Sequence, residues 1–270
     1  MLEVMQRFKP EIVFHAAAYK HVPLMEANPL EALRNNAIAT QVTAKTAAAA
    51  GAARFVLVST DKAVNPRTVM GATKAMAEWI VEAAGQRTPQ TNFTIVRFGN
   101  VLASSGSVVP IFRSQIEQGG PVTVTHPEMS RYFMTIPESV QLVIQAGDLG
   151  ASSGEVFVLE MGEPVPILEL ARNMIRLAGY EPDTDIAIEI VGVRPGEKLH
   201  EELFNADERS MPTSAERIVR AVRSSPLDPD WVEETVRRLE SLVASGDEAG
   251  LAEHVVELMG AEGSARRTLA

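Results

Sequence analysis

The chain has 270 residues, a formal net charge of −10 and a hydrophobic fraction of 46%. This profile is typical of a globular protein with a sizeable core, in one large domain or two small ones. The lack of cysteine excludes a disulfide scaffold, a thiolate nucleophile and any cysteine-ligated metal site. The negative charge argues against nucleic acid as a partner. No apolar run reaches the ~18–20 residues of a membrane span, and no signal-peptide pattern is present, so we expect a cytoplasmic chain without a membrane span.

The first 105 residues alternate predicted strands with predicted helices. Strands and helices that alternate at this length form parallel sheets with helices on both faces, so we predict a doubly wound α/β fold. In chain order the predicted elements are a helix end at residues 1–10, a buried strand at Glu11–Ala18, a helix at Leu30–Ala50, a buried strand at Arg54–Ser59, a helix at Thr68–Ala84 and a strand at Phe93–Arg97.

After about residue 105 the pattern loosens, which indicates a smaller lobe. Its predicted elements are helices at Val109–Gln118, Pro137–Gly147 and Ile167–Ala178 and strands at Val122–Thr125, Glu155–Leu159 and Ile186–Val191. Two amphipathic helices follow, around Trp231–Val243 and Leu251–Met259, and the tail at 261–270 carries no pattern.

A doubly wound dinucleotide-binding fold opens with a strand, a G-x-G-x-x-G loop and a helix. The chain contains no G-x-G-x-x-G. We therefore expect that the first βαβ units of such a sheet are missing and that the chain is a fragment.

Ligands of doubly wound sheets bind beyond the carboxyl ends of the strands. The segment STDKAVNPRTVMGATK (59–74) follows a predicted strand at that end. Its adjacent Asp61 and Lys62 place a carboxyl and an amine beside any ligand, where they can act as general acid and general base on neighbouring atoms. Taken alone, a neighbouring Asp and Lys most often form an exposed turn.

Five phrases of the chain resemble one branch of the extended short-chain dehydrogenase/reductase superfamily. They are HAAAYKHVPLME (15–26), STDKAVNP (59–66), MGATKAMAE (70–78), RFGNVLASSGSVVPIF (97–112) and RPGEKLHEEL (194–203). The branch is the polysaccharide-biosynthesis family of UDP-N-acetylglucosamine 4,6-dehydratases, and the resemblance covers about residues 9–225.

The resemblance implies a partial Rossmann-like sheet with a smaller C-terminal substrate-binding lobe. It assigns residues 1–105 to the second half of an NAD-binding domain, 106–225 to a nucleotide-sugar-binding lobe with strands of the sheet interleaved, 226–260 to C-terminal helices and 261–270 to a disordered tail. NAD is the implied cofactor, UDP-N-acetylglucosamine the substrate and a homo-oligomer the expected assembly. No metal site is expected, because no metal-ligand spacing occurs.

In this family NAD takes a hydride from C4 of the sugar, water leaves across C5 and C6, and the hydride returns to C6. The resemblance implies that Asp61 is the acid at O6 and Lys62 the base at C5, with Thr60 in the same motif. Most of the superfamily has Tyr where this chain has Met70, and Met cannot exchange a proton. The group that deprotonates the 4-hydroxyl is left open among Lys74, Asp61 and a bound water.

The resemblance also assigns binding residues. The cofactor contacts are Ala16, Ala17, Ala18, Asn36, Ser59 and Lys74, and Lys74 holds the nicotinamide ribose. The substrate contacts are Tyr19, Lys20, His21, Asn100, Arg131, Arg194 and Glu197. Arginine suits a diphosphate because its planar fork binds two oxygens at once.

Three other functions remain open at this stage. They are a nucleotide-sugar 4-epimerase, a dehydratase that inverts C5, and a non-catalytic nucleotide-sugar-binding module. An epimerase needs neither an acid at O6 nor a base at C5, so the Asp61-Lys62 pair favours dehydration. UDP binding without NAD binding would indicate the binding module.

Overall fold

The computed structural model describes residues 1–150, 152–251 and 254–255. They form two compact units. Unit 1 comprises 1–98, 141–160 and the described residues from 202 onward, and unit 2 comprises 99–140 and 161–201. Most of the helix predicted at Leu251–Met259 and the whole tail at 261–270 lie outside the described residues. No helix in the described ranges has the length and apolar character needed to cross a membrane.

Unit 1 is built on a six-stranded sheet in the order β1-β2-β3-β8-β12-β11. The first four strands are parallel, and the last two are antiparallel to their neighbours. This arrangement confirms the predicted α/β class with a mainly parallel sheet. The strands are β1 (Ile12–His15), β2 (Arg54–Val58), β3 (Asn92–Arg97), β8 (Glu155–Leu159), β12 (Ile218–Arg223) and β11 (Glu208–Pro212).

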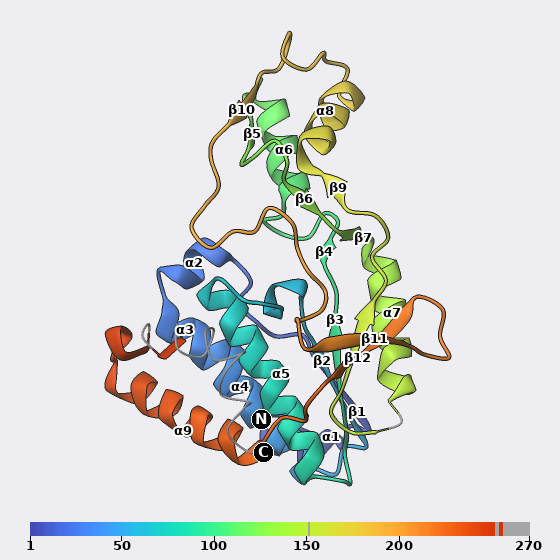
Figure 1. Cartoon of the computed structure of the whole chain (residues 1–270), viewed down its shortest axis with the longest axis vertical. Helices are drawn as coiled ribbons and strands as arrows, with labels where there is room; N and C mark the ends of the chain where they lie inside the picture. Colours follow the sequence, from blue (N-terminus) through green and yellow to red (C-terminus); the bar gives the residue numbers. More distant parts are fainter. Residues whose placement is uncertain (151, 252–253, 256–270) are drawn as a thin grey trace. The chain divides into compact units, whose positions relative to one another are not determined.

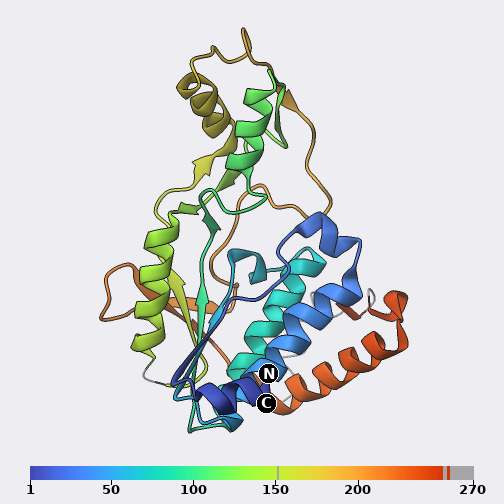
Figure 2. The same ribbon diagram turned by 180° about the vertical axis from the view of Figure 1, so that it is seen from behind.

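Helices cover both faces of this sheet (Figures 1 and 2). On one face, small alanines of α4 and α5 let the helices approach Phe55 and Phe93, whose rings lie 5.5 Å apart on neighbouring strands. On the other face, Gly147 of α7 packs against Val56. The helices in or entering unit 1 are α1 (Leu2–Phe8), α2 (Val22–Glu26), α3 (Pro29–Leu33), α4 (Ala39–Ala49), α5 (Val69–Arg87), α7 (Ile136–Leu149) and α9 (Pro229–Ser245).

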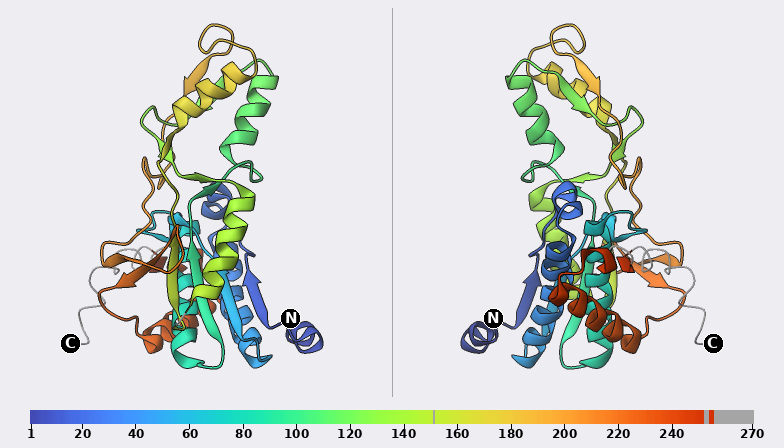
Figure 3. Two further views of the ribbon diagram at one scale, coloured as in Figure 1. Left: turned by 90° about the vertical axis from the view of Figure 1, so that its right-hand side faces the viewer. Right: turned by 90° about the vertical axis from the view of Figure 1, so that its left-hand side faces the viewer.

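The strand predicted at Glu11–Ala18 is shorter and more exposed than expected. β1 pairs with β2 only from Ile12 to His15, and of these four residues only His15 is buried. β1 is the edge strand of the sheet, with no further strand beside it in the described residues (Figure 3). The prediction of a buried strand was wrong because β1 lies at the edge of the sheet among the described residues, where Ile12 is 47% and Phe14 45% exposed.

The helix predicted at Leu30–Ala50 is not continuous. A π-helical segment, η1 (Arg34–Ile38), separates α3 from α4. A π turn inserts an extra residue, which rotates the following side chains relative to an ordinary α-helix. Here it brings Asn36 into the interior, where the residue is 1% exposed.

The antiparallel strands β11 and β12 were not predicted. In β12 only Ile218 and Ala221 are buried, at a spacing of three that does not resemble a strand. Arg220 and Arg223 of this strand pair with Glu155 and Glu82. A charged strand of this kind is stabilised by partners distant in sequence, so its local pattern gives no signal.

Unit 2 has its own apolar core, formed by α6, α8 and strand β5. β5 pairs with β10 in a parallel two-stranded sheet, which shortens the strand predicted at Ile186–Val191 because only three residues reach β5. The elements are β4 (Asn100–Val101), α6 (Val108–Glu117), β5 (Val122–Val124), β6 (Ser130–Arg131), β7 (Phe133–Met134), β9 (Val165–Pro166), α8 (Ile167–Leu177) and β10 (Ile188–Ile190).

Candidate active site

The carboxyl ends of β1, β2 and β3 lie at the same edge of the sheet, because these strands are parallel and adjacent. The loops that follow them carry the predicted residues of unit 1. Ala16–His21 follows β1 and Ser59–Lys62 follows β2. The backbone N–H of Asp61 donates to Phe98 O, at the end of β3, over 3.0 Å. The sequence therefore predicted the correct edge of the sheet.

Asp61 is buried, with 0% of its side chain exposed. Its Oδ1 accepts hydrogen bonds from Thr60 Oγ1 at 2.9 Å and from Lys62 Nζ at 3.0 Å. Its Oδ2 is buried and has no hydrogen-bond partner in the structure. A buried carboxylate oxygen without a donor is costly in free energy.

The loop that carries these residues packs tightly against α5. Residues Asp61–Ala63 form the 3₁₀ turn η2, which Thr60 caps. Gly71, in the first turn of α5, lies so near this loop that a Cβ there would stand 2.5 Å from the carbonyl oxygen of Lys62. Only glycine permits this approach without a shift of the backbone.

Lys74 lies on α5 with its residue 7% exposed, and its Nζ donates to Val58 O at 2.8 Å. Burial lowers the pKa of Lys74 to about 8, and the negative charge of Glu78, one turn further along the helix, partly offsets this effect. A cation therefore persists at neutral pH next to the end of β2, close to its titration point.

Asn36 binds protein backbone. Its Oδ1 accepts from the backbone N–H of Tyr19 at 2.7 Å, and its Nδ2 donates to Tyr19 O at 2.9 Å and to Thr73 Oγ1 at 3.1 Å. The side chain thus fixes the loop that follows β1 against α5. The sequence pattern singled out Asn36 as a cofactor contact and gave no sign of this clamp.

The remaining predicted residues of unit 1 divide by burial. Ser59 is buried, and its hydroxyl donates to Glu78 Oε1 at 2.5 Å. Met70 packs in a small apolar cluster with Met25 and Ala32, which suits the packing role expected of Met. The other predicted residues lie on the loop after β1, where Ala18 is half-buried and Ala16, Ala17, Tyr19, Lys20 and His21 are exposed.

In unit 2 the structure brings three of the four predicted substrate residues together. Arg131 is 7% exposed, and its Nη2 lies 3.3 Å from Glu197 Oε1. The other carboxylate oxygen of Glu197 accepts from the backbone N–H of Arg194 at 3.3 Å, while the Arg194 side chain is exposed. Asn100 lies in β4 and pairs with Phe133 of β7, and its N–H donates to the carbonyl oxygen of Tyr132, the residue after Arg131.

Sequence reasoning missed three buried polar residues beside these positions. His15 bonds Thr40 Oγ1 at 2.9 Å, and burial, together with the charge of Lys74, lowers the pKa of His15 to about 4. Glu78 accepts the Ser59 hydroxyl, and Glu201 lies 3.6 Å from Arg131 Nε. The four-residue spacing of Lys74 and Glu78 on one helix was the available signal.

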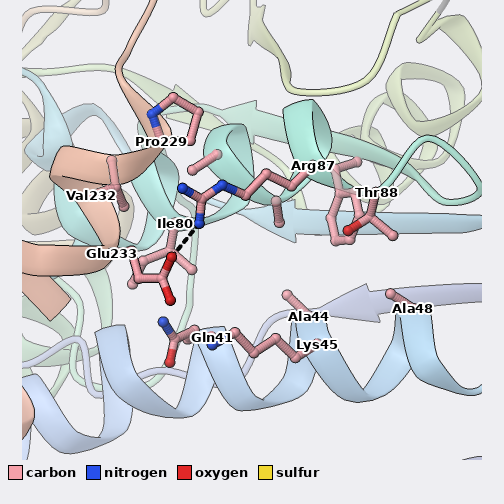
Figure 4. A pocket seen from close by; sticks show the side chains of 13 residues that line it. Gln41, Ala44, Lys45, Ala48, Ile80, Arg87, Thr88, Pro229, Val232 and Glu233 are labelled. Atoms are coloured by element: carbon pink, nitrogen blue, oxygen red, sulfur yellow. Dashed lines mark hydrogen bonds and ion pairs between the residues drawn. The ribbon is translucent and has the colours of Figure 1, made fainter. Parts of the chain in front are cut away.

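A cavity of about 210 Å³ lies between α4, α5 and α9, away from the predicted residues (Figure 4). None of those residues lines it. Its floor is apolar, with Ile80, Phe93 and Val232, and its rim holds the ion pair of Arg87 with Glu233. The described ranges also contain no cluster of acidic or histidine side chains able to hold a metal ion.

A family model described as "Polysaccharide biosynthesis protein" matches residues 1–223. The Capsular polysaccharide biosynthesis protein CapD of Staphylococcus aureus is 58% identical over 82% of this chain and 36% of its own length. A UDP-glucose 4-epimerase of Rickettsia typhi is 38% identical over 73% of this chain and 57% of its own. The chain spans little more than a third of CapD and of the Bacillus subtilis protein EpsC, of which it covers 38%.

Solved structures agree with the fold. Pen from Bacillus thuringiensis superposes with a TM-score of 0.73 at 32% identity, over 89% of this chain and 79% of Pen. A dTDP-glucose 4,6-dehydratase from Streptomyces venezuelae, solved with NAD and TYD bound, has a TM-score of 0.65 at 21% identity, over 75% of this chain and 68% of that chain. The second likeness concerns the fold alone.

Proposed function

Because the chain belongs to the polysaccharide biosynthesis protein family, we propose that it catalyses the NAD-dependent 4,6-dehydration of UDP-N-acetylglucosamine. The product would be a UDP-4-keto-6-deoxy-N-acetylhexosamine for the synthesis of surface polysaccharide. The observation that carries the proposal is the Asp61–Lys62 pair, with one carboxylate oxygen buried and without a donor.

This pair can supply both proton transfers of an elimination. Lys62 Nζ stands 3.0 Å from Asp61 Oδ1, so a proton can pass between them. After that transfer the carboxyl is an acid and the amine a base.

The proposed steps follow from these positions. Lys62 takes the proton from C5 of the 4-keto sugar, and the C6–O6 bond breaks as Asp61 protonates O6, so one water leaves and a C5–C6 double bond forms. Reduction of that bond at C6 and protonation at C5 complete the product. Met70 lies in an apolar cluster, so the 4-hydroxyl gives its proton to Lys74, Asp61 or a water.

Bound NAD would take the hydride from C4 and return it to C6. Lys74 suits its nicotinamide ribose, because it remains a cation at neutral pH and lies at the end of β2. Asn36 would act on the cofactor side through the backbone of Tyr19. The neighbouring dTDP-glucose dehydratase of the same fold was solved with NAD bound, which supports the choice of cofactor.

In unit 2, we assign the diphosphate to the exposed guanidinium of Arg194 and the ribose hydroxyls to Glu197. Arg131 would hold Glu197 in place, because its Nη1 already donates to Ser130 O and Leu199 O. We further propose Tyr19, Lys20 and His21 as contacts of the sugar and Asn100 as a contact of a phosphate or sugar oxygen. A homo-oligomer in the cytoplasm, or on the cytoplasmic face of the membrane, remains our expectation.

A 4-epimerase is the second candidate, because epimerases of Rickettsia share 37–38% identity with this chain. Epimerisation needs neither the acid role of Asp61 at O6 nor the base role of Lys62 at C5. The two activities differ in their products, since only dehydration removes the 6-hydroxyl. Nuclear magnetic resonance of the product also reports the configuration at C5 and so tests the inverting dehydratase.

The test joins the chain to an upstream NAD-binding half that carries a G-x-G-x-x-G loop, and compares this parent with its Asp61→Asn variant in the presence of NAD and UDP-N-acetylglucosamine. We expect a 4-keto-6-deoxy product from the parent and at least a ~100-fold slower dehydration by the variant, because an amide cannot protonate O6. Oxidation at C4 would continue, so the absorbance of reduced nicotinamide would rise. Turnover by Asp61→Asn at the parent rate would refute the acid role.

Calorimetry separates the enzyme from a binding module. A dehydratase binds both NAD and UDP in separate titrations of the parent that carries the upstream NAD-binding half. If that parent bound UDP without NAD and formed no product, the chain would be a nucleotide-sugar-binding module and the proposed activity would be wrong.

A further inference from the structure

Both ends of the loop that carries Asp61 and Lys62 are fixed by side chains outside that loop. At its start, the Ser59 hydroxyl donates to Glu78 Oε1 at 2.5 Å. At its end, the backbone N–H of Asn65 donates to Asn205 Oδ1 at 2.9 Å. Asn65 has a φ of 40°, in the left-handed region, so this end of the loop needs a bond that holds it.

The two anchors meet at one buried residue. Arg97, with 0% of its side chain exposed, donates from Nη2 to Glu78 Oε2 at 2.6 Å and from Nη1 to Glu208 Oε2 at 2.8 Å. Glu208 in turn accepts from the backbone N–H of Asn205 at 2.8 Å and from its Nδ2 at 3.1 Å. A continuous chain of hydrogen bonds therefore runs from Ser59 through Arg97 to Asn65.

The charges of Arg97, Glu78 and Glu208 make this series of hydrogen bonds rigid. Both carboxylates are paired with Arg97 inside the protein, where charge-assisted bonds are strong and a lost partner is costly. If Glu208 moved away from Arg97, a buried charge would lose its partner. Glu208 therefore stays in place and holds Asn205 in one orientation. The amide oxygen of Asn205 then has one position in which to meet Asn65.

We propose that Asn205 is a positioning residue for the Asp61–Lys62 pair, through its bond to the Asn65 backbone. Its action on catalysis rests on the proposed function, whereas its action on the loop does not. Asn205 lies 140 residues from Asn65 in sequence. It belongs to the segment before β11, which sequence patterns did not single out.

The test substitutes Asn205→Ala and follows amide hydrogen exchange of the loop. Ala63 N–H and Val64 N–H donate to Thr60 O and Asp61 O, and both bonds report on the turn around Lys62. Loss of one anchoring bond should speed their exchange roughly tenfold. The matched control is Asn92→Ala, which removes the bond of another amide side chain to Gly150 O, at the amino end of β3.

In turnover, Asn205→Ala should lower kcat for dehydration roughly tenfold and change KM for the sugar less than about threefold. Reduced nicotinamide should accumulate, as in Asp61→Asn. The proposal is overturned if loop exchange is unchanged, if Asn92→Ala raises it equally, or if turnover is unchanged in a loosened loop.

The exchange measurement and the turnover measurement separate a failure of this proposal from a failure of the proposed function. If the parent chain does not dehydrate the sugar, the proposed function fails, and the exchange arm alone decides whether Asn205 anchors the loop. If Asn205→Ala does not fold, Asn205→Ser takes its place, because serine keeps a polar group in the buried position but is too short to reach Asn65.

Discussion

Lys74 is the residue at which the proposed function and the stability of the fold oppose each other. A charged amine that is buried costs folding free energy, and the lowered pKa of about 8 measures that cost. The unfolded chain has the ordinary pKa of 10.5 and binds more protons between these values, so this group makes stability rise with pH from about 8 to 10.5.

We predict that Lys74→Met raises the free energy of unfolding at pH 7 by about 1–3 kcal/mol, since each pH unit between the two values is worth about 1.4 kcal/mol. The gain should vanish above pH 10.5, where the amine is neutral in both states. Urea unfolding at pH 7 and above pH 10.5 measures both values. A variant less stable than the parent at pH 7 would contradict the prediction.

The sequence predicted where the single residues Asp61 and Lys62 lie, because a motif that directly follows a buried strand lies at the end of that strand. It did not predict what holds them. Glu208 and Arg97 are 111 residues apart, and no local pattern shows that two distant charges will share one buried bond. The sequence singled out Asn36, but it did not predict the hydrogen bonds of Asn36 to the Tyr19 backbone, because Asn36 lies in the π turn.

Among the elements, α9 has the clearest structural role. It packs on α5 through Val232, Val236 and Leu239, and Trp231 meets Trp79 with ring centres 5.4 Å apart. Its amphipathic pattern was visible in the sequence, because side chains three and four residues apart share one face of a helix. The partner of that face was not predicted.

We expect Leu239→Ala to destabilise the chain by about 2–5 kcal/mol, because Leu239 is 1% exposed and its removal leaves a cavity. Glu240→Ala, on the exposed side of the same helix, should change stability by less than about 0.5 kcal/mol. Thermal or urea unfolding compares the two. Equal effects would mean that α9 does not pack on α5.

Element boundaries were predicted where the local pattern decides them and missed where tertiary partners do. β8 has the predicted limits, because its largely apolar sequence EVFVL fits a strand that is covered on both faces of the sheet. β11 and β12 were missed because their arginines are paired with Glu82, Glu155 and Glu208. Such ion pairs neutralise the charges of a polar segment, so that it can join a sheet.

The whole chain consists of two units with separate apolar cores. The core of unit 2 surrounds Ile175, which is 0% exposed, and includes Phe112 and Val122. The loosened pattern after residue 105 pointed to a second lobe. The resemblance implied that strands of the sheet are interleaved there, but the pattern did not show where the chain returns to the first unit, at 141–160 and after 202.

Separate cores predict separate losses of stability. Ile175→Ala should cost unit 2 about 2–5 kcal/mol and speed amide exchange in β5 and β10. Exchange in β2 and β3 of unit 1 should stay as in the parent. A uniform rise in both units would show that they unfold as one cooperative body.

The close approach of Gly71 to the Lys62 carbonyl joins a helix and a loop at a point with no spare room. Any ligand that displaces the loop must carry the first turn of α5 along, and with it Lys74. A displacement of the loop is thus passed mechanically to the helix that carries Lys74. Engineering of this loop would best leave the joint at Gly71 intact.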